Sequence, residues 1–276
     1  MQVFGELQDD GFTLIKNPYS LPYLRDLTSW LDFQLPILAD KDYNDPANYF
    51  GLKDEQEFGV LYDMWQRFPI CRELASSPAI CSALEPVLGK DIFLYENSFL
   101  FKSAKTQDYV PWHQDFMNRP DEPIKFVAFI SLDPLRQGEG ALRVIPGSHK
   151  HGFYPYRTKR GQAHHTGIPE SCYSSLCIND AVYINQDPGD ILLFNQLLVH
   201  SLDEGSPTSI CQCRSFRFSY QGFAQMYSPR LSPISIFGGD PSSIRKHGYS
   251  PHIKHLRSKS LVYRALNRLK LGVGLK

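Results

Sequence analysis

Apolar residues follow two different spacings along the chain, and the change comes near residue 90. In the first part, four leucines recur every three or four positions, which is the spacing of one face of an α-helix. They are Leu21, Leu24, Leu27 and Leu31. A polar stretch at 39–48 follows and indicates a loop. The pattern therefore predicts a helical front section over residues 1–90.

From residue 92 the apolar residues gather in short β-like runs. The runs are 92–95, 98–102, 125–132, 141–145 and 190–194, and residues 215–220 alternate Ser and Arg with Phe and Tyr. Turns rich in Gly and Pro, such as Pro146-Gly147 and Pro188-Gly189, separate them. Many short strands between such turns are typical of a double-sheet jelly roll. We therefore expect a mainly β fold with flanking helices and a jelly-roll core at about 92–222.

Composition supports one domain spanning residues 1–276. The chain has 20 Pro, 19 Gly and 13% aromatic residues, which suits strands and turns better than a helical bundle. Residues 150–185 carry His164, His165 and further Gly and Pro, and they resemble a long loop over one end. Long loops in compact domains are often lids or binding loops, so this segment is expected to contribute to a pocket.

Charge is unevenly distributed although the formal net charge is zero. The tail at 241–276 holds nine Lys or Arg and no Asp or Glu. An apolar helical face in this tail favours a solvated helix packed on the body. The alternative is an acidic partner or a membrane surface, while no nucleic-acid partner is expected.

The cysteines and the N-terminus indicate a soluble cytoplasmic protein. The six cysteines are thinly spread, and Cys211-x-Cys213 lacks the spacing of zinc or redox motifs, so all six are expected to remain structural thiols. The N-terminal residues show no signal-peptide pattern, and no stretch is long and apolar enough to cross a membrane.

Three residues suggest a metal site. His113 and Asp115 are two positions apart, so in an extended backbone their side chains point to the same face. His200 ends an apolar run and adds a second imidazole. Two His and one carboxylate form the facial triad of non-haem iron(II) oxygenases, whereas catalytic zinc is usually held by other ligand sets. The expected ion is therefore Fe(II).

Three motifs in this order resemble those of the phytanoyl-CoA dioxygenase-like (PhyH) family. They are Val110-Pro-Trp-His-Gln-Asp115, the segment 140–152 with its Pro146-Gly-Ser-His149 turn, and the segment from Pro188-Gly-Asp190 to His200-Ser201. The resemblance covers about residues 92–222. It implies a double-stranded β-helix, a cupin-like jelly roll, with iron at its open mouth. Within the second motif, His149 is expected to stabilise a loop rather than to bind metal.

The resemblance also implies a reaction. The family uses Fe(II), 2-oxoglutarate and O2, releases succinate and CO2, and oxidises a substrate, here expected to be a small molecule. Family halogenases have a small residue in place of the carboxylate ligand, so the presence of Asp115 favours hydroxylation or a related desaturation. The alternatives are a non-oxidative cupin-like metal enzyme, such as an isomerase, and a non-catalytic binding module.

The cosubstrate requires a cation for its far carboxylate. Arg217 and Arg214 both follow His200, and the alternation of 215–221 favours Arg217, with Ser219 two positions further on. Lys102 is a supporting candidate. The sequence contains no code for the substrate itself, and the residues after the ligand pair are the candidates for binding it: Phe116, Asn118 and Arg119.

Overall fold

A computed structural model of the chain describes residues 5–38, 48–53, 56–102, 110–115, 124–158, 166–202, 213–222 and 234–238. The helices are α1 (Leu21–Leu38), α2 (Met64–Arg67), α3 (Arg72–Ala75) and α4 (Pro78–Leu88). The first strands are β1 (Phe12–Ile15), β2 (Asn48–Lys53), β3 (Gln56–Tyr62), β4 (Ile92–Lys102), β5 (Val110–His113), β6 (Phe126–Ser131) and β7 (Leu142–Val144). The later strands are β8 (Arg157–Thr158), β9 (Thr166–Gly167), β10 (Val182–Ile184), β11 (Ile191–Asn195), β12 (His200–Leu202), β13 (Cys213–Gln221) and β14 (Ile234–Phe237).

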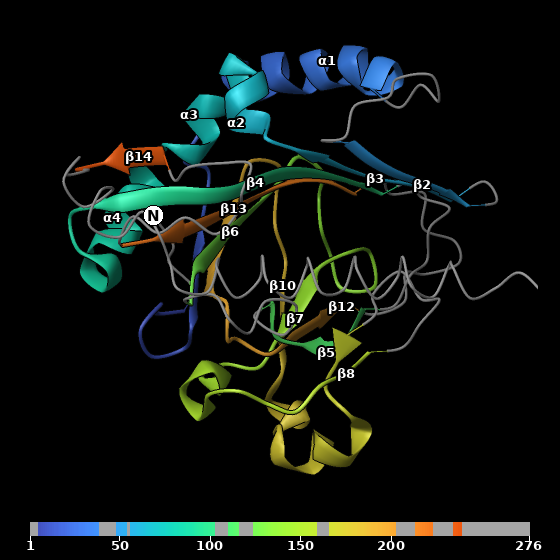
Figure 1. Cartoon of the computed structure of the whole chain (residues 1–276), viewed down its shortest axis with the longest axis vertical. Coiled ribbons are helices and arrows are strands. Elements are labelled where there is room, and N and C mark those ends of the chain that lie inside the picture. Colours follow the sequence, from blue (N-terminus) through green and yellow to red (C-terminus); the bar gives the residue numbers. More distant parts are fainter. Residues whose placement is uncertain are drawn as a thin grey trace, which may run out of the picture.

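Two antiparallel sheets form the body, and Figure 1 shows the larger one between the helices and the smaller one. The larger sheet runs β1-β11-β6-β13-β4-β3-β2, with β14 also paired to β4. The smaller sheet runs β10-β7-β12-β5. Apolar side chains of both sheets, among them Val127, Phe194, Val144 and Ile184, meet in one buried cluster. The expected jelly roll with flanking helices is confirmed.

The helices cover the outer face of the larger sheet (Figure 1). Phe216, Phe218 and Tyr220 of β13 are fully buried in the cluster that also holds Leu27 and Leu31 of α1. Side chains alternate along a strand, so the neighbouring residues of β13 face the space between the sheets. The predicted alternation of this strand is therefore confirmed, and it places Arg217 inside the jelly roll.

The front section, predicted to be helical, also contains strands. It contributes β1, β2 and β3 to the larger sheet, and β1 pairs with β11 so that Ile15 lies opposite Ile191. Four apolar residues in a row fit a buried strand as well as a piece of helix, so periodicity alone could not identify β1. Leu24, Leu27 and Leu31 form a buried face of α1, as their spacing predicted, whereas Leu21 at the first position of the helix is 79% exposed.

The segment at 150–185 also lies elsewhere than expected. Its described part packs on the outer face of the smaller sheet, where Ile168 and Leu176 meet Trp112 and Val199. Figure 1 shows its short helical turns on the side of that sheet away from α1–α4. The described residues of this segment therefore cover the sheet that carries the expected metal ligands. His164 and His165 lie outside the described residues.

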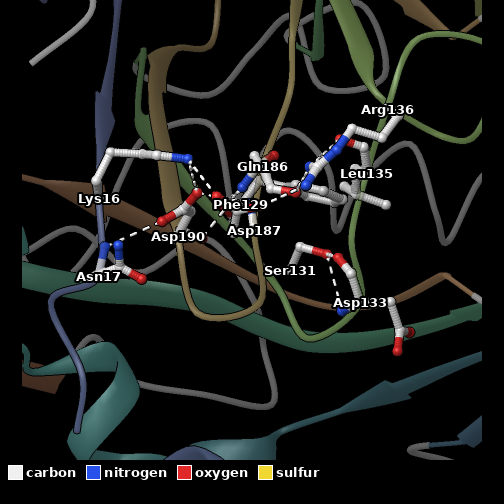
Figure 2. A network of polar contacts seen from close by, with 10 residues as sticks. All are labelled: Lys16, Asn17, Phe129, Ser131, Asp133, Leu135, Arg136, Gln186, Asp187 and Asp190. Atoms are coloured by element: carbon white, nitrogen blue, oxygen red, sulfur yellow. Dashed lines mark hydrogen bonds and ion pairs between the residues drawn. The ribbon is translucent and has the colours of Figure 1, made fainter. Parts of the chain in front are cut away.

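A polar network joins β1 to the turns before β7 and β11 (Figure 2). The fully buried Asp190 accepts hydrogen bonds from Lys16 Nζ (2.5 Å), Asn17 N (3.0 Å) and Asp187 N (2.7 Å). Asp187 also pairs with Arg136, which donates to the carbonyl of Gln186. The Pro-Gly-Asp motif thus has a structural role here, because its buried aspartate accepts hydrogen bonds from two backbone N–H groups and from Lys16.

Gly189 of the same motif needs to be glycine. Its φ of +87° lies in the left-handed region, and an added Cβ would lie 2.5 Å from Leu24 of α1. The tight turn and the close approach of α1 therefore both exclude a side chain.

Among the described residues, no helix is long and apolar enough to span a membrane. The five cysteines that the structure describes are free thiols, as expected, and two of them, Cys71 and Cys81, are buried. Cys211 and the tail at 241–276 lie outside the described residues.

Candidate metal centre

His113, Asp115 and His200 come together between the two sheets. One ligand atom from each lies within 4.8 Å of the others. His113 ends β5, Asp115 follows two residues later, and His200 opens the neighbouring strand β12, where it pairs with His113. The imidazole centroids are 4.1 Å apart. The structure therefore brings together the three residues that the sequence suggested.

Backbone carbonyls orient both imidazoles in the same way. His113 Nδ1 lies 2.9 Å from the carbonyl of Pro111, and His200 Nδ1 lies 2.9 Å from the carbonyl of Leu198. A carbonyl can only accept, so each Nδ1 must donate the proton and each Nε2 becomes the lone-pair nitrogen. Both Nε2 atoms face Asp115 Oδ1, at 3.7 Å and 3.8 Å. The histidines are therefore held in the tautomer that binds a metal through Nε2.

Gln114 and Ser148 support the segments that carry the ligands, a role that could not be predicted from the sequence. The Gln114 amide donates to the carbonyls of Gly152 (2.8 Å) and Leu197 (2.6 Å) and accepts from Tyr154 N (3.0 Å). Ser148 Oγ accepts a hydrogen bond from the backbone N of Val199. In the sequence, only the position of Gln114 between two ligands indicates such a role. Its three hydrogen-bond partners are distant along the chain and are brought near by the fold.

His149 has the structural role that was expected of it. Its Nε2 lies 3.1 Å from the carbonyl of Gln8, and its ring packs so closely on Gly11 that a Cβ there would lie 2.4 Å from Nδ1. Gly147 N also donates to the carbonyl of Asp10. The Pro-Gly-Ser-His turn therefore ties residues 8–11 to the segment that precedes His200.

Arg217 determines the electrostatics of the centre. Its Nη2 donates to Asp115 Oδ2 at 2.8 Å, and its Nη1 lies 3.4 Å from Glu96 Oε2. Burial would raise the pKa of Asp115, but the positive charge of Arg217 and its hydrogen bond to the carboxylate outweigh burial and hold that pKa well below its ordinary value. A lowered pKa favours the ionised carboxylate, which is the form that binds a metal.

Two buried serine hydroxyls lie on the inner face of β13. Ser215 Oγ and Ser219 Oγ, two positions to either side of Arg217, are buried without a hydrogen-bond partner among the described residues. Buried polar atoms are rarely left unpaired, so this face suits a ligand that accepts hydrogen bonds, such as a carboxylate. Ser219 was predicted for that role, and Ser215 was missed although it belongs to the same alternation.

Arg214 points to the other face of β13. Its guanidinium binds Asp133 Oδ1 at 2.8 Å and Asp32 Oδ1 at 2.6 Å, beneath α1. These two carboxylates and the side-chain alternation place the Arg214 side chain away from the space between the sheets. Its position therefore favours Arg217 as the candidate for the cosubstrate anchor. The side chain of Lys102 and all of Phe116, Asn118 and Arg119 lie outside the described residues.

Comparison with known proteins identifies the family. The sequence model of phytanoyl-CoA dioxygenase (PhyH) matches residues 7–201, which is more than half of the chain. The chain belongs to the PhyH family. This family consists of iron(II)- and 2-oxoglutarate-dependent oxygenases, so the His-x-Asp…His arrangement and the jelly roll agree with its members.

Curated relatives match part of the chain. A probable phytanoyl-CoA dioxygenase of Caenorhabditis elegans is 23% identical over 48% of the chain and 45% of its own length. L-proline trans-4-hydroxylase of Streptomyces griseoviridis is 31% identical over 34% of the chain and 37% of its own length. The chain thus aligns with less than half the length of these relatives.

Solved structures of other proteins share the fold. EctD from S. alaskensis with bound Fe superposes with a TM-score of 0.66 at 16% identity, covering 84% of each chain. The epimerase SnoN, in complex with Fe3+ and alpha ketoglutarate, gives a TM-score of 0.61 at 16% identity and covers 86% of this chain and 90% of SnoN. At these identities the likeness establishes the architecture.

Proposed function

We propose that the protein is an iron(II)- and 2-oxoglutarate-dependent dioxygenase that hydroxylates a small-molecule metabolite. The observation that supports this most directly is the convergence of three ligand atoms within 4.8 Å, with both histidines presenting Nε2. The relatives named for hydroxylation of L-proline and of 1-deoxypentalenic acid act on small molecules. In this proposal His113, Asp115 and His200 bind Fe(II).

The cosubstrate site is proposed on the inner face of β13. Arg217 supplies the cation for the far carboxylate, and the Ser215 and Ser219 hydroxyls supply further donors. An arginine has five N–H groups, and the contacts with Asp115 and Glu96 leave others for a bound carboxylate. When bound, iron and 2-oxoglutarate supply the oxidising chemistry: 2-oxoglutarate loses CO2 to give succinate, and one oxygen atom of O2 enters the substrate.

The protein's own contribution is geometry and exclusion of water. The side chains of His113 and Asp115 are 14% exposed and that of His200 is 5% exposed, so the centre is close to dry. Carbonyl-held imidazoles cannot rotate away without breaking a hydrogen bond, which fixes the ligand directions before metal arrives. For Phe116, Asn118 and Arg119 a role in substrate binding is proposed from their sequence position after the ligand pair.

The test is substrate-dependent succinate formation with Fe(II), 2-oxoglutarate and O2, screened over candidate metabolites. We expect His200→Ala and Asp115→Ala to abolish succinate formation and to weaken Fe(II) binding while the fold is kept. Arg214→Met is the matched control on the other face of the same sheet. Product formation without succinate release would favour a non-oxidative isomerase, and neither metal binding nor turnover would favour a binding module.

A further inference from the structure

The two carboxylate oxygens of Asp115 have different partners. Oδ1 is the oxygen that approaches Nε2 of both histidines, at 3.7 Å and 3.8 Å. Oδ2 instead receives the hydrogen bond from Arg217 Nη2 at 2.8 Å. A carboxylate with both oxygens available can bind an ion through two positions, whereas one with an occupied oxygen binds through the other.

Arg217 is itself held from its other side by Glu96. The Arg217 Nη1 to Glu96 Oε2 distance is 3.4 Å, and the two side chains are 21% and 17% exposed. Strand pairing fixes this approach, because β13 pairs with β4 so that Arg217 lies opposite Ser98 and Ser219 lies opposite Glu96. Ser98 and Glu96 are two positions apart on β4 and so point to the same face as Arg217. An arginine held between two carboxylates has little freedom to turn.

We propose that Glu96 is a positioning residue of the metal centre. By holding Arg217, it keeps the guanidinium on Oδ2 of Asp115, so that Asp115 binds metal through Oδ1 alone. Three coordination positions then stay open, which is the number that a bidentate oxo-acid and O2 together require. This inference rests on the proposed function, because it assumes that the three ligands bind a divalent ion.

The test uses Co(II) alone, without 2-oxoglutarate, as the probe. Its visible absorption bands respond to coordination number and geometry, and its affinity is measured in the same titration. We expect Glu96→Gln to weaken Co(II) binding about tenfold, the lower end of the effect of residues behind metal ligands, and to change the visible spectrum. Glu73→Gln, on the exposed surface of α3, should change neither. Thermal unfolding of the apoproteins shows whether each variant is folded.

A double-mutant cycle separates positioning from simple charge attraction. If Glu96 acts through Arg217, Glu96→Gln should add little to the loss caused by Arg217→Met, since the residue it positions is already absent. If Glu96→Gln weakens Co(II) binding equally in both backgrounds, Glu96 acts on the ion through space and the proposal is overturned. Wild-type affinity and spectrum in a folded Glu96→Gln protein would also overturn it. Failure of the wild-type protein to bind Co(II) would instead remove the proposed function and this inference with it.

Discussion

Replacing Asp190 should destabilise the protein far more than replacing Asp187, although both carboxylates bind Lys16. Asp190 is fully buried and accepts from Lys16 Nζ and from two backbone N–H groups. In Asp190→Ala the N–H groups of Asn17 and Asp187 lose their acceptor, and both of these hydrogen bonds are partly buried. Each unsatisfied donor costs about 1–3 kcal/mol, so the loss should be about 3–5 kcal/mol. At roughly 3 °C per kcal/mol for a chain of this size, the melting temperature should fall by roughly 10 °C.

Asp190→Asn is a gentler change at the same place. It keeps the shape and one acceptor oxygen but places an NH2 group against a donor, so about 2 kcal/mol should be lost. Asp187→Asn is the matched control, because the Asp187 side chain is 47% exposed and exposed ion pairs contribute about 0–1 kcal/mol. Urea unfolding followed by fluorescence gives both values, and the slope with denaturant shows whether the unfolding transition is comparable.

The pH dependence provides a second check on the control. Hydrogen bonds from Arg136 and Lys16 lower the pKa of Asp187, so this carboxylate stabilises the fold above its ordinary pKa. That contribution is lost as the pH falls through the lowered value, and the difference between wild-type and Asp187→Asn proteins should then disappear. Equal melting temperatures for Asp190→Asn and Asp187→Asn at neutral pH would refute the assignment of the buried network as the stabilising element.

Three further outcomes are expected. Arg217→Met should raise the 2-oxoglutarate concentration needed for half-maximal turnover by one to two orders of magnitude at saturating iron, on the order of 2 kcal/mol for a lost charge-assisted pair. Arg214→Met should leave that concentration unchanged. The reverse order in cosubstrate titrations would contradict the assignment of Arg217 to the cosubstrate site. Burial raises the pKa of Cys71 to about 12, so iodoacetamide at mildly alkaline pH should label the exposed Cys177 and spare Cys71, as peptide mass spectrometry would show. Deleting residues 258–276 should leave 2-oxoglutarate turnover measurable, and its complete loss in a folded truncation would show that the tail contributes to the site.

Local patterns in the sequence were enough for the parts of the site that lie on one strand. The alternation along 215–221 correctly separated Arg217 from the aromatic residues beneath the helices, because a strand has a fixed side-chain period. The spacing of His113 and Asp115 likewise places both on one side of the chain.

Contacts between distant strands could not be predicted in this way. Nothing in the sequence indicated that the Arg217 guanidinium contacts Asp115. Because it does, both metal binding and cosubstrate binding should respond to the loss of Arg217. That contact depends on how the two sheets pack, because Arg217 lies on β13 of the larger sheet and Asp115 follows β5 of the smaller one. No single run of residues specifies this packing. The outward position of Arg214 was also undetermined, since a bulge could have reversed the strand, and Asp133 and Asp32 became visible as its partners in the fold.

The position of β13 has a consequence for how the chain folds during synthesis. This strand lies in the middle of the larger sheet and pairs with both β4 and β6, yet both of those strands are made long before it. On the ribosome the edges of β4 and β6 that face β13 therefore stay unpaired until residue 221 has emerged. In the same way, β1 stays unpaired until β11 has been synthesised. Such non-local pairing slows folding and leaves open strand edges exposed to other chains. We therefore expect slow refolding and a need for chaperones at high expression levels, with any chain that stops before β13 unable to join the two halves of the sheet.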